Sequence, residues 1–200
     1  MSKYIEDIEN YKYIMINNLS INDSEKEIIL KAQEGDLQAF EELIKPYQTK
    51  VFGLAYHIAG NNPDAEDLFQ EAFLRVYRNI RQYSGTSSFG TWLYSVCKNT
   101  FLNEIKKKQR IKKKEMSLKD DLPKNETAPS LSTKKHSDDI EQILRVIPLK
   151  FRCPIILFDL QGYNYREIAE ILKTTVPGVK NRILKGRKIL KKKFKKSGDF

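Results

Sequence analysis

Four carboxylates and an amide crowd the stretch between Pro63 and Ala72. The side chains are Asp64, Glu66, Asp67, Gln70 and Glu71. Carboxylates at this density can hold a divalent cation, move protons or meet a basic protein surface. A metal-dependent nuclease would need a second acidic cluster from elsewhere in the chain, and the sequence shows none. A plainer interpretation is also open, because carboxylates in the first turns of a helix complement the positive end of its dipole.

A loop of small and hydroxylated residues follows, with the sequence SGTSS between Tyr83 and Phe89. Glycine lets such a loop turn sharply, and hydroxyl groups beside aromatic rings can shape a pocket. The same residues also suit an ordinary turn between two helices.

Charge is divided unevenly along the chain. Residues 1–71 hold 6 Lys and Arg against 14 Asp and Glu, whereas residues 72–200 hold 30 against 12. The cationic blocks, above all Lys106 to Lys114, indicate a nucleic-acid partner. A generally lysine-rich proteome would explain a high isoelectric point but not this segregation. The acidic front and the basic back therefore predict two different partners.

The cysteines and histidines of the sequence do not indicate a disulfide, a metal site or a catalytic site. Cys97 and Cys153 lie in separate apolar stripes, which favours small buried thiols over a disulfide or a metal site. His57 and His136 each stand alone, so we expect no cofactor, no metal and no catalytic residue. No long uncharged apolar run is present and the N-terminus lacks a signal-peptide core. We therefore expect a cytoplasmic protein without membrane insertion.

Helical spacing of apolar residues predicts the elements of the first half. A capping box at Ser24 opens a helix that Gly35 ends, and Asp36 starts the next, which runs to residue 60 with a bend or break at Pro46. A third helix begins with Asn62 as its cap and extends to about residue 80. Ser88 caps a fourth helix, which we expect to run from residue 89 to about residue 109.

The second half also predicts helices. One opens at Asp138 and ends before Pro148, and another covers residues 151–161, where Pro154 fits only in the first turn. Asn164 caps the next helix with Glu167 three residues on. A short turn and a last helix from residue 175 then complete a helix-turn-helix pattern.

The last helix has two different faces. Val179 and Ile183 belong to an apolar face that can dock, while the opposite face is cationic and can enter a major groove. The composition between the halves changes to KDDLPKNETAPSLSTKKHS, which is typical of a linker. The fold class that follows is all-α, with two small helical domains joined by a flexible linker. We place an extension at 1–23, the first domain at 24–112, the linker at 113–137 and the second domain at 138–200.

Two stretches resemble one known family. The first carries Asp64-Ala65-Glu66-Asp67-Leu68, Gln70-Glu71, Phe73-Leu74-Arg75-Val76-Tyr77, Gly85, Phe89, Thr91-Trp92-Leu93-Tyr94 and Asn99. In this order they are similar to region 2 of the extracytoplasmic-function (ECF) group of sigma-70 family RNA polymerase sigma factors. The second stretch, IPLKFRCPIILFDLQGYNYREIAEILKTTVPGVKNRILKGRK, resembles sigma region 4. Region 2, a linker and region 4 without region 3 form the two-domain architecture of that group.

The resemblance implies roles for the residues that match. The acidic residues Asp64, Glu66, Asp67, Gln70 and Glu71 would bind the β′ clamp helices of core polymerase. The −10 promoter element would meet Tyr83, Ser84, Gly85, Thr86, Ser87, Ser88, Phe89, Lys98 and Asn99. Asn99 would contact a flipped base, while Lys98 and Lys106 to Lys108 would hold phosphates. The −35 element would meet Thr175, Lys180, Asn181, Arg182, Leu184, Lys185 and Lys188.

The resemblance also implies the β flap of the polymerase, promoter DNA and an anti-sigma factor as partners. The chain departs from the family pattern at Ser95, Cys97, Lys173 and Asn181, where a basic residue, alanine, glycine and serine are usual. We interpret these differences as altered promoter preference or drift. The alternative function is a helix-turn-helix regulator that does not bind core polymerase, which leaves the first matching stretch unexplained.

Overall fold

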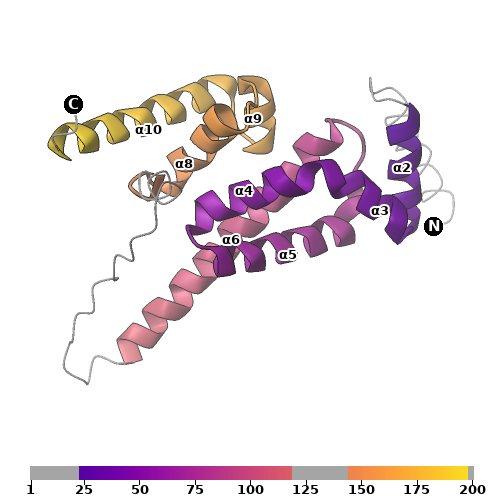
Figure 1. Ribbon diagram of the computed structural model, residues 1–200, viewed down its shortest axis with the longest axis horizontal. Coiled ribbons are helices and arrows are strands. Elements are labelled where there is room, and N and C mark those ends of the chain that lie inside the picture. The colour runs from indigo at the N-terminus through magenta and orange to yellow at the C-terminus, as the bar shows by residue number, and fades with distance from the viewer. Residues whose placement is uncertain (1–22, 119–143, 198–200) are drawn as a thin grey trace.

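The computed structural model describes residues 23–118 and 144–197, and within these ranges every regular element is helical. The first domain contains α2 (Asp23–Glu34), α3 (Leu37–Ile44), α4 (Gln48–Ala59), α5 (Asn62–Asn79) and α6 (Phe89–Leu118). Helices α4, α5 and α6 pack together, and α2 and α3 pair at one end (Figure 1). The buried core between them includes Val51, Leu54, Leu68, Val76 and Leu93.

Local signals set several helix ends as expected. Gly35 ends α2 with a φ of 106°, a conformation that suits glycine. Asp36 then caps α3, because its side chain accepts a hydrogen bond from the backbone N–H of Ala39. The predicted break at Pro46 is confirmed, since a 3₁₀ turn, η1 (Lys45–Tyr47), separates α3 from α4.

The start of α5 corrects the expected cap. Asn61, rather than Asn62, is the N-cap, and its side chain accepts from the backbone N–H of Asp64. Asn62 and Pro63 therefore occupy the first turn, where proline costs no hydrogen bond. Two adjacent asparagines offer the same capping chemistry, so the sequence alone did not separate them.

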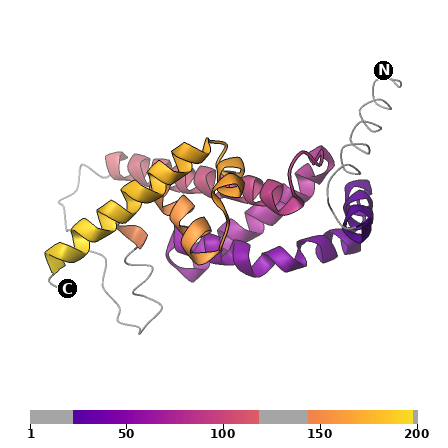
Figure 2. The same ribbon diagram turned by 90° about the horizontal axis from the view of Figure 1, so that it is seen from above.

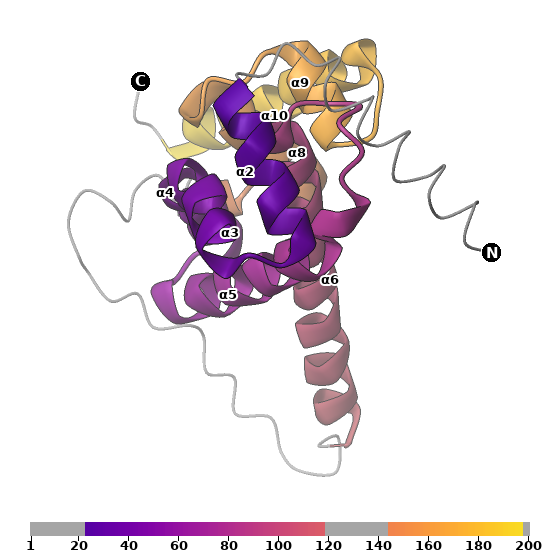
Figure 3. The ribbon, with the colours of Figure 1, turned by 90° about the vertical axis from the view of Figure 1, so that its right-hand side faces the viewer.

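Helix α6 begins as predicted and ends later. The Ser88 hydroxyl accepts from the backbone N–H of Thr91 and so caps the helix. The helix then continues past the expected end near residue 109 to Leu118 and projects from the domain (Figure 3). Lysine and arginine are good helix formers, and ion pairs such as that of Lys108 with Asp64 offset part of the repulsion within the cationic run.

The second domain contains α8 (Leu149–Ile155), the π-helical turn η3 (Ile156–Leu160), α9 (Tyr165–Ile171) and α10 (Val176–Ser197). Pro154 lies near the end of α8 and not in a first turn, because α8 starts two residues earlier than expected. The predicted capping box is confirmed: Asn164 accepts from Glu167 N–H, and the Glu167 carboxylate accepts from Asn164 N–H.

Helices α8 and α10 cross closely. A Cβ added to Gly186 would meet the terminal methyl group of Ile155 and lie 3.3 Å from Phe151 Cβ, so a larger residue at this crossing would require its neighbours to move. Val179 and Ile183 are buried on the same side of α10. Figure 2 shows the second domain lying against the first, with α9 packed on α6 and α8 on α4. The helix expected between 138 and 147 falls largely outside the described residues.

Candidate nucleic-acid and protein interfaces

The acidic residues of α5 lie on an accessible surface. Glu66, Asp67 and Gln70 are exposed, while Asp64 and Glu71 are partly buried. Lys108 of α6 reaches this surface, and its Nζ lies 2.5 Å from Asp64 Oδ1 and 3.3 Å from Asp67 Oδ2. Lys108 and then Asn61 lower the pKa of Asp64 by hydrogen bonding. In the described ranges no three metal-ligating side chains converge. Exposed carboxylates such as Glu66 and Asp67 can meet a basic protein surface.

Tyr83 and Phe89 build the loop that precedes α6. Both side chains are 1% exposed, and their rings meet edge to face with centroids 5.5 Å apart. The Tyr83 hydroxyl donates a hydrogen bond of 2.7 Å to the carbonyl of Ser87, and Gly85 turns the chain with a φ of 73°. Thr86 and Ser88 are exposed. The loop therefore presents hydroxyl groups on a rigid aromatic base.

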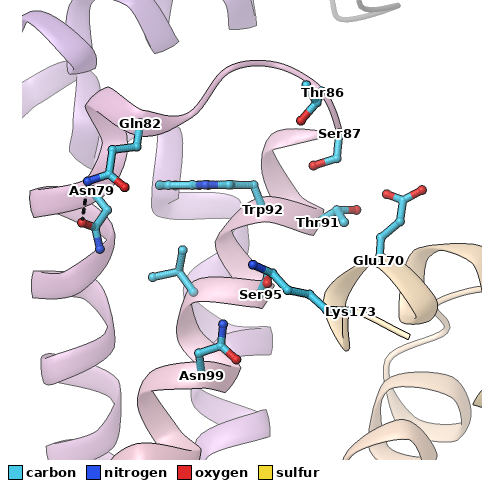
Figure 4. A pocket seen from close by; sticks show the side chains of 11 residues that line it. Asn79, Gln82, Thr86, Ser87, Thr91, Trp92, Ser95, Asn99, Glu170 and Lys173 are labelled. Atoms are coloured by element: carbon cyan, nitrogen blue, oxygen red, sulfur yellow. Dashed lines mark hydrogen bonds between the residues drawn. The ribbon is translucent and has the colours of Figure 1, made fainter. Parts of the chain in front are cut away.

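A cavity of about 370 Å³ lies beside this loop (Figure 4). Trp92, Ser95 and Asn99 line it from one face of α6, at a spacing of three and four residues. Its other residues are Asn79, Gln82, Thr86, Ser87, Thr91, Val96, Glu170 and Lys173. An indole and three carboxamides suit a planar heterocycle, since the ring can stack and amides both donate and accept hydrogen bonds.

Several residues of this cavity were not predicted. Asn79 and Gln82 join it only through the tertiary fold, whereas Thr91 and Ser95 lie on α6 with Trp92. In the sequence, the spacing of Trp92, Ser95 and Asn99 by three and four residues indicates that they share one face of a helix.

Lys98 is placed differently from its neighbour Asn99. It is 6% exposed, whereas Asn99 is exposed and lines the cavity. Burial lowers the pKa of Lys98, and the positive charges of Lys173 and Arg182 in the second domain lower it further. In this arrangement Lys98 is buried beside the second domain, where Lys173 and Arg182 act on its charge.

The exposed cations of α6 continue beyond the cavity. Asn103, Lys106, Lys107, Arg110 and Ile111 surround a shallow groove of about 380 Å³. Its cationic rim can hold phosphate groups along a strand.

Helix α10 has the features of a recognition helix. The Thr175 hydroxyl accepts from the backbone N–H of Gly178 and caps it. Lys180, Asn181, Leu184, Lys185 and Lys188 are exposed. Arg182 is partly buried toward the first domain, so it differs from the other predicted residues. Lys173 adopts a φ of 47° in the turn between α9 and α10, where the family pattern has glycine.

The two cysteines are buried and reduced, as expected. Burial raises the pKa of the Cys153 thiol to about 11, which leaves it unreactive near neutral pH. In the part of the chain that the structure describes, no helix combines the length and hydropathy needed to cross a bilayer.

Comparison with known proteins agrees with this geometry. Models of Sigma-70 region 2 and Sigma-70 region 4 match residues 43–111 and 137–190. The ECF RNA polymerase sigma factor SigW of Bacillus subtilis is 31% identical over 85% of this chain and 96% of its own length. The ECF RNA polymerase sigma factor SigE of Mycolicibacterium smegmatis is also 31% identical, but the match spans 61% of that longer protein.

A solved structure shares the fold. The sigma factor RpoE of Bartonella quintana, in complex with the anti-sigma factor NepR, matches with a TM-score of 0.63 at 20% identity, over 80% of this chain and 98% of its own. Both sigma regions are thus present in order, and the match to SigW covers 85% of this chain. The chain belongs to the ECF group of the sigma-70 family of RNA polymerase sigma factors.

Proposed function

We propose that this sigma factor binds core RNA polymerase through the acidic surface of α5 and captures a base of the −10 element in the cavity beside Trp92. The observation that carries the proposal is this cavity, where Asn99 and an indole ring converge next to a cationic groove. The bounds 24–112 for region 2, 113–137 for the linker and 138–200 for region 4 belong to the same proposal.

The acidic surface suits the β′ clamp helices of the polymerase, which are its proposed partner. Asp67 and Glu66 are exposed, and carboxylates facing a basic helical hairpin accelerate encounter and fix its register. Lys108 already pairs with Asp64 and Asp67. Binding to the polymerase would therefore replace Lys108 at these carboxylates with a basic side chain of the clamp helices.

The cavity suits a base that has left the duplex. Stacking on an aromatic ring contributes about 1–3 kcal/mol per base, and amide groups can bond the Watson–Crick edge. Asn99, Gln82 and Asn79 supply such groups. Tyr83 and Phe89 are buried, so their proposed role is to hold the loop in shape rather than to touch DNA.

The exposed face of α10 suits the −35 element. Lys180 and Lys185 can donate to guanine edges or phosphates, and Leu184, at 68% exposure, can contact a thymine methyl group. Region 4 would also bind the β flap, and an anti-sigma factor would complete the partners. The proposed role is non-catalytic and cytoplasmic.

Run-off transcription with bacterial core polymerase on the promoter of the protein's own gene tests the proposal. Asp67→Lys should abolish both core binding and the specific start, because it reverses an exposed charge of the acidic surface. Asn99→Ala should weaken the start while core binding stays intact. Gln38→Ala is the control, since Gln38 is an exposed amide of α3 that lines neither the cavity nor the cationic groove.

Binding to core polymerase without DNA separates this function from its rival. A helix-turn-helix regulator would bind the promoter alone and would not bind core polymerase. If the protein behaves in that way, the proposed function is wrong.

A further inference from the structure

Two stacked aromatic rings lie beside the recognition helix α10. Phe158 comes from the π-helical turn η3, and Tyr165 is the first residue of α9. Their ring centroids are 4.6 Å apart, and the ring planes are inclined by only 14°. Both residues are partly buried. The face of an aromatic ring carries partial negative charge, so a pair of this kind can attract cations from a neighbouring helix.

Two cations of α10 lie over these rings. Lys180 Nζ is 5.3 Å from the centroid of Tyr165, and Arg187 Cζ is 5.7 Å from the centroid of Phe158. The two cations are seven residues apart, which is close to two helical turns, so they leave α10 on the same face. A ring attracts a cation within about 6 Å of its centroid. The aromatic pair therefore holds both ends of one face of α10.

The two cations are held in different ways. Arg187 Nη2 lies 2.5 Å from Asp159 Oδ1, so the arginine charge is paired within region 4. For Lys180 the described residues supply the ring of Tyr165 but no carboxylate within ion-pair distance. An ammonium group has several N–H donors, so the ring contact leaves donors that can reach an acceptor on DNA. Lys180 is thus the cation of this face that is both held and able to bind.

Lys180 stands where a recognition helix reads bases. Thr175 caps α10, and Lys180 lies in the second turn, where it is exposed together with Asn181 and Leu184. The N-terminal residues of a recognition helix contact base edges in the major groove, and lysine can donate to O6 and N7 of guanine. The direction in which the Lys180 side chain points should therefore affect how well the base is read.

A ring that holds this side chain before DNA arrives would increase affinity. Lysine has many rotamers, and immobilising such a side chain in a complex lowers affinity by about two- to tenfold. Attraction to Tyr165 restricts the Lys180 ammonium group in the free chain, so less of this loss occurs on binding. The gain applies only where Lys180 meets its base, and it is therefore a contribution to specificity.

We propose that Tyr165 is a positioning residue for −35 recognition, whose ring holds the ammonium group of Lys180 in place while that group donates to a base edge. Phe158 supports the ring of Tyr165 by stacking on it. The inference rests on the proposed function, because it requires that α10 reads the −35 element. It adds a side chain of α9 to the residues that determine which promoters are bound.

The binding test uses holoenzyme assembled from the full chain and bacterial core polymerase. Fluorescence anisotropy compares a promoter fragment of the protein's own gene with the same fragment carrying a scrambled −35 element. Tyr165→Leu should weaken binding to the first fragment about two- to fivefold, which is the size of an exposed cation–π contact, and should leave binding to the scrambled fragment unchanged. Tyr165→Phe keeps the ring and should bind as the wild type does.

A double-mutant cycle separates positioning from a loss of structure. In a Lys180→Met chain, Tyr165→Leu should have no further effect on affinity, because no ammonium group is left for the ring to hold. Lys185 is the matched control, since it is an exposed lysine of the same helix without a ring contact in the described residues. In a Lys185→Met chain, Tyr165→Leu should weaken binding as much as in the wild type. A loss that is the same with and without Lys180 would indicate a general distortion of α10 and would overturn the proposal.

Nuclear magnetic resonance tests the contact in the free chain. With isotope-labelled lysine, the ε-methylene protons of Lys180 should resonate upfield, because they lie near the face of a ring. The Lys180→Met chain identifies the signal by its absence. The signal should return to the usual lysine position in Tyr165→Leu and stay shifted in Tyr165→Phe. An unshifted signal in the wild type would refute the contact.

The wild type alone tests the function on which this inference rests. Failure to bind core polymerase, or equal affinity for the two promoter fragments, would refute the proposed function and with it the role of Tyr165 in recognition. If the wild type prefers the intact −35 element but Tyr165→Leu has the same preference, the proposed function stands and the positioning role is wrong.

Discussion

Lys108 and Asp64 form an ion pair across two helices, with Nζ 2.5 Å from Oδ1. The lysine comes from the cationic run of α6, and the carboxylate from the acidic start of α5. The chain thus supplies its own cation to the surface that we propose for the polymerase, and this pairing leads to the first prediction.

Lys108→Gln should tighten binding to core polymerase by up to about fivefold, because freeing the carboxylates removes a competing exposed pair worth about 0.2–1 kcal/mol. Fluorescence anisotropy with labelled protein at two salt concentrations measures the dissociation constant. Lys107→Gln is the control, since Lys107 pairs with Glu104 on its own helix. Unchanged or weaker binding by Lys108→Gln would contradict the competition.

The same pair predicts how stability depends on pH. Pairing lowers the pKa of Asp64 below its ordinary value of 3.8. The stability that Asp64 contributes to the folded state is therefore present above pH 3.8, and it is lost as pH falls through the lower pKa of the folded state. Pairing raises the pKa of Lys108, so the stability that Lys108 contributes to the folded state is lost as pH rises through that higher pKa.

The difference in unfolding free energy between wild type and Lys108→Gln should therefore be constant between about pH 5 and 9 and vanish in strong acid. Urea titrations across this range measure it. A difference that persists below the folded pKa of Asp64 would assign the stabilisation to the aliphatic stem of Lys108 instead.

Two glycine-to-alanine changes should act in opposite directions. Gly186→Ala brings a Cβ to 2.4 Å from Ile155, and overpacking of this kind costs about 1–3 kcal/mol. Gly53→Ala meets no atom within 4 Å and should stabilise α4 by about 0.5–1 kcal/mol, because alanine is the better helix former. Chemical unfolding of the two variants measures both effects. A change in the free energy of unfolding with the same sign in both variants would disprove the packing argument.

Tyr83→Phe should loosen the loop before α6. It removes the hydrogen bond to the Ser87 carbonyl, which contributes about 0.5–1.5 kcal/mol, and leaves the ring packed on Phe89. Hydrogen exchange of residues 84–88 should accelerate, and affinity for a single-stranded −10 oligonucleotide should fall while core binding is retained. Tyr77→Phe, at a partly exposed ring against Phe40, should change neither property.

Leu184→Ala should weaken binding to a −35 duplex without changing stability by more than about 0.5 kcal/mol, since the side chain is 68% exposed. A lost contact with a thymine methyl group should lower discrimination at one base pair. Leu160→Ala, another exposed leucine of region 4, is the control. Equal loss of affinity across all sequences would assign Leu184 a non-specific role.

Local signals allowed much of the fold to be predicted. The caps at Asp36, Ser88 and Asn164 depend on one side chain and the next three residues, and all three were found as expected. The two helical domains of sigma regions 2 and 4 are confirmed in the described residues. The errors at Asn62 and Pro154 concern where a helix begins, which shifts easily by one or two residues.

The candidate site was predicted less completely. Asn99 and the hydroxyl loop were found from a linear motif, whereas Asn79 and Gln82 approach only when α5 packs on α6. The burial of Lys98 depends on the second domain, which no local pattern places. These residues required long-range contacts, and a single sequence does not display them.

In the described residues, hydrogen bonds from Arg145, Arg152 and Gln161 of region 4 to region 2 share a property that bears on how the contact between the domains can diverge. Their acceptors are main-chain carbonyls of Lys50, Ile58 and Gly60, which exist whatever side chain stands there. Region 2 can thus accumulate substitutions at the first two positions without losing an acceptor. For these hydrogen bonds only the donors on region 4 depend on side-chain identity, whereas the ring contact of Tyr94 with Tyr163 depends on one side chain from each domain. Relatives would gain or lose these hydrogen bonds mainly by exchanging a few polar residues in one domain, a short evolutionary step compared with remodelling two complementary surfaces.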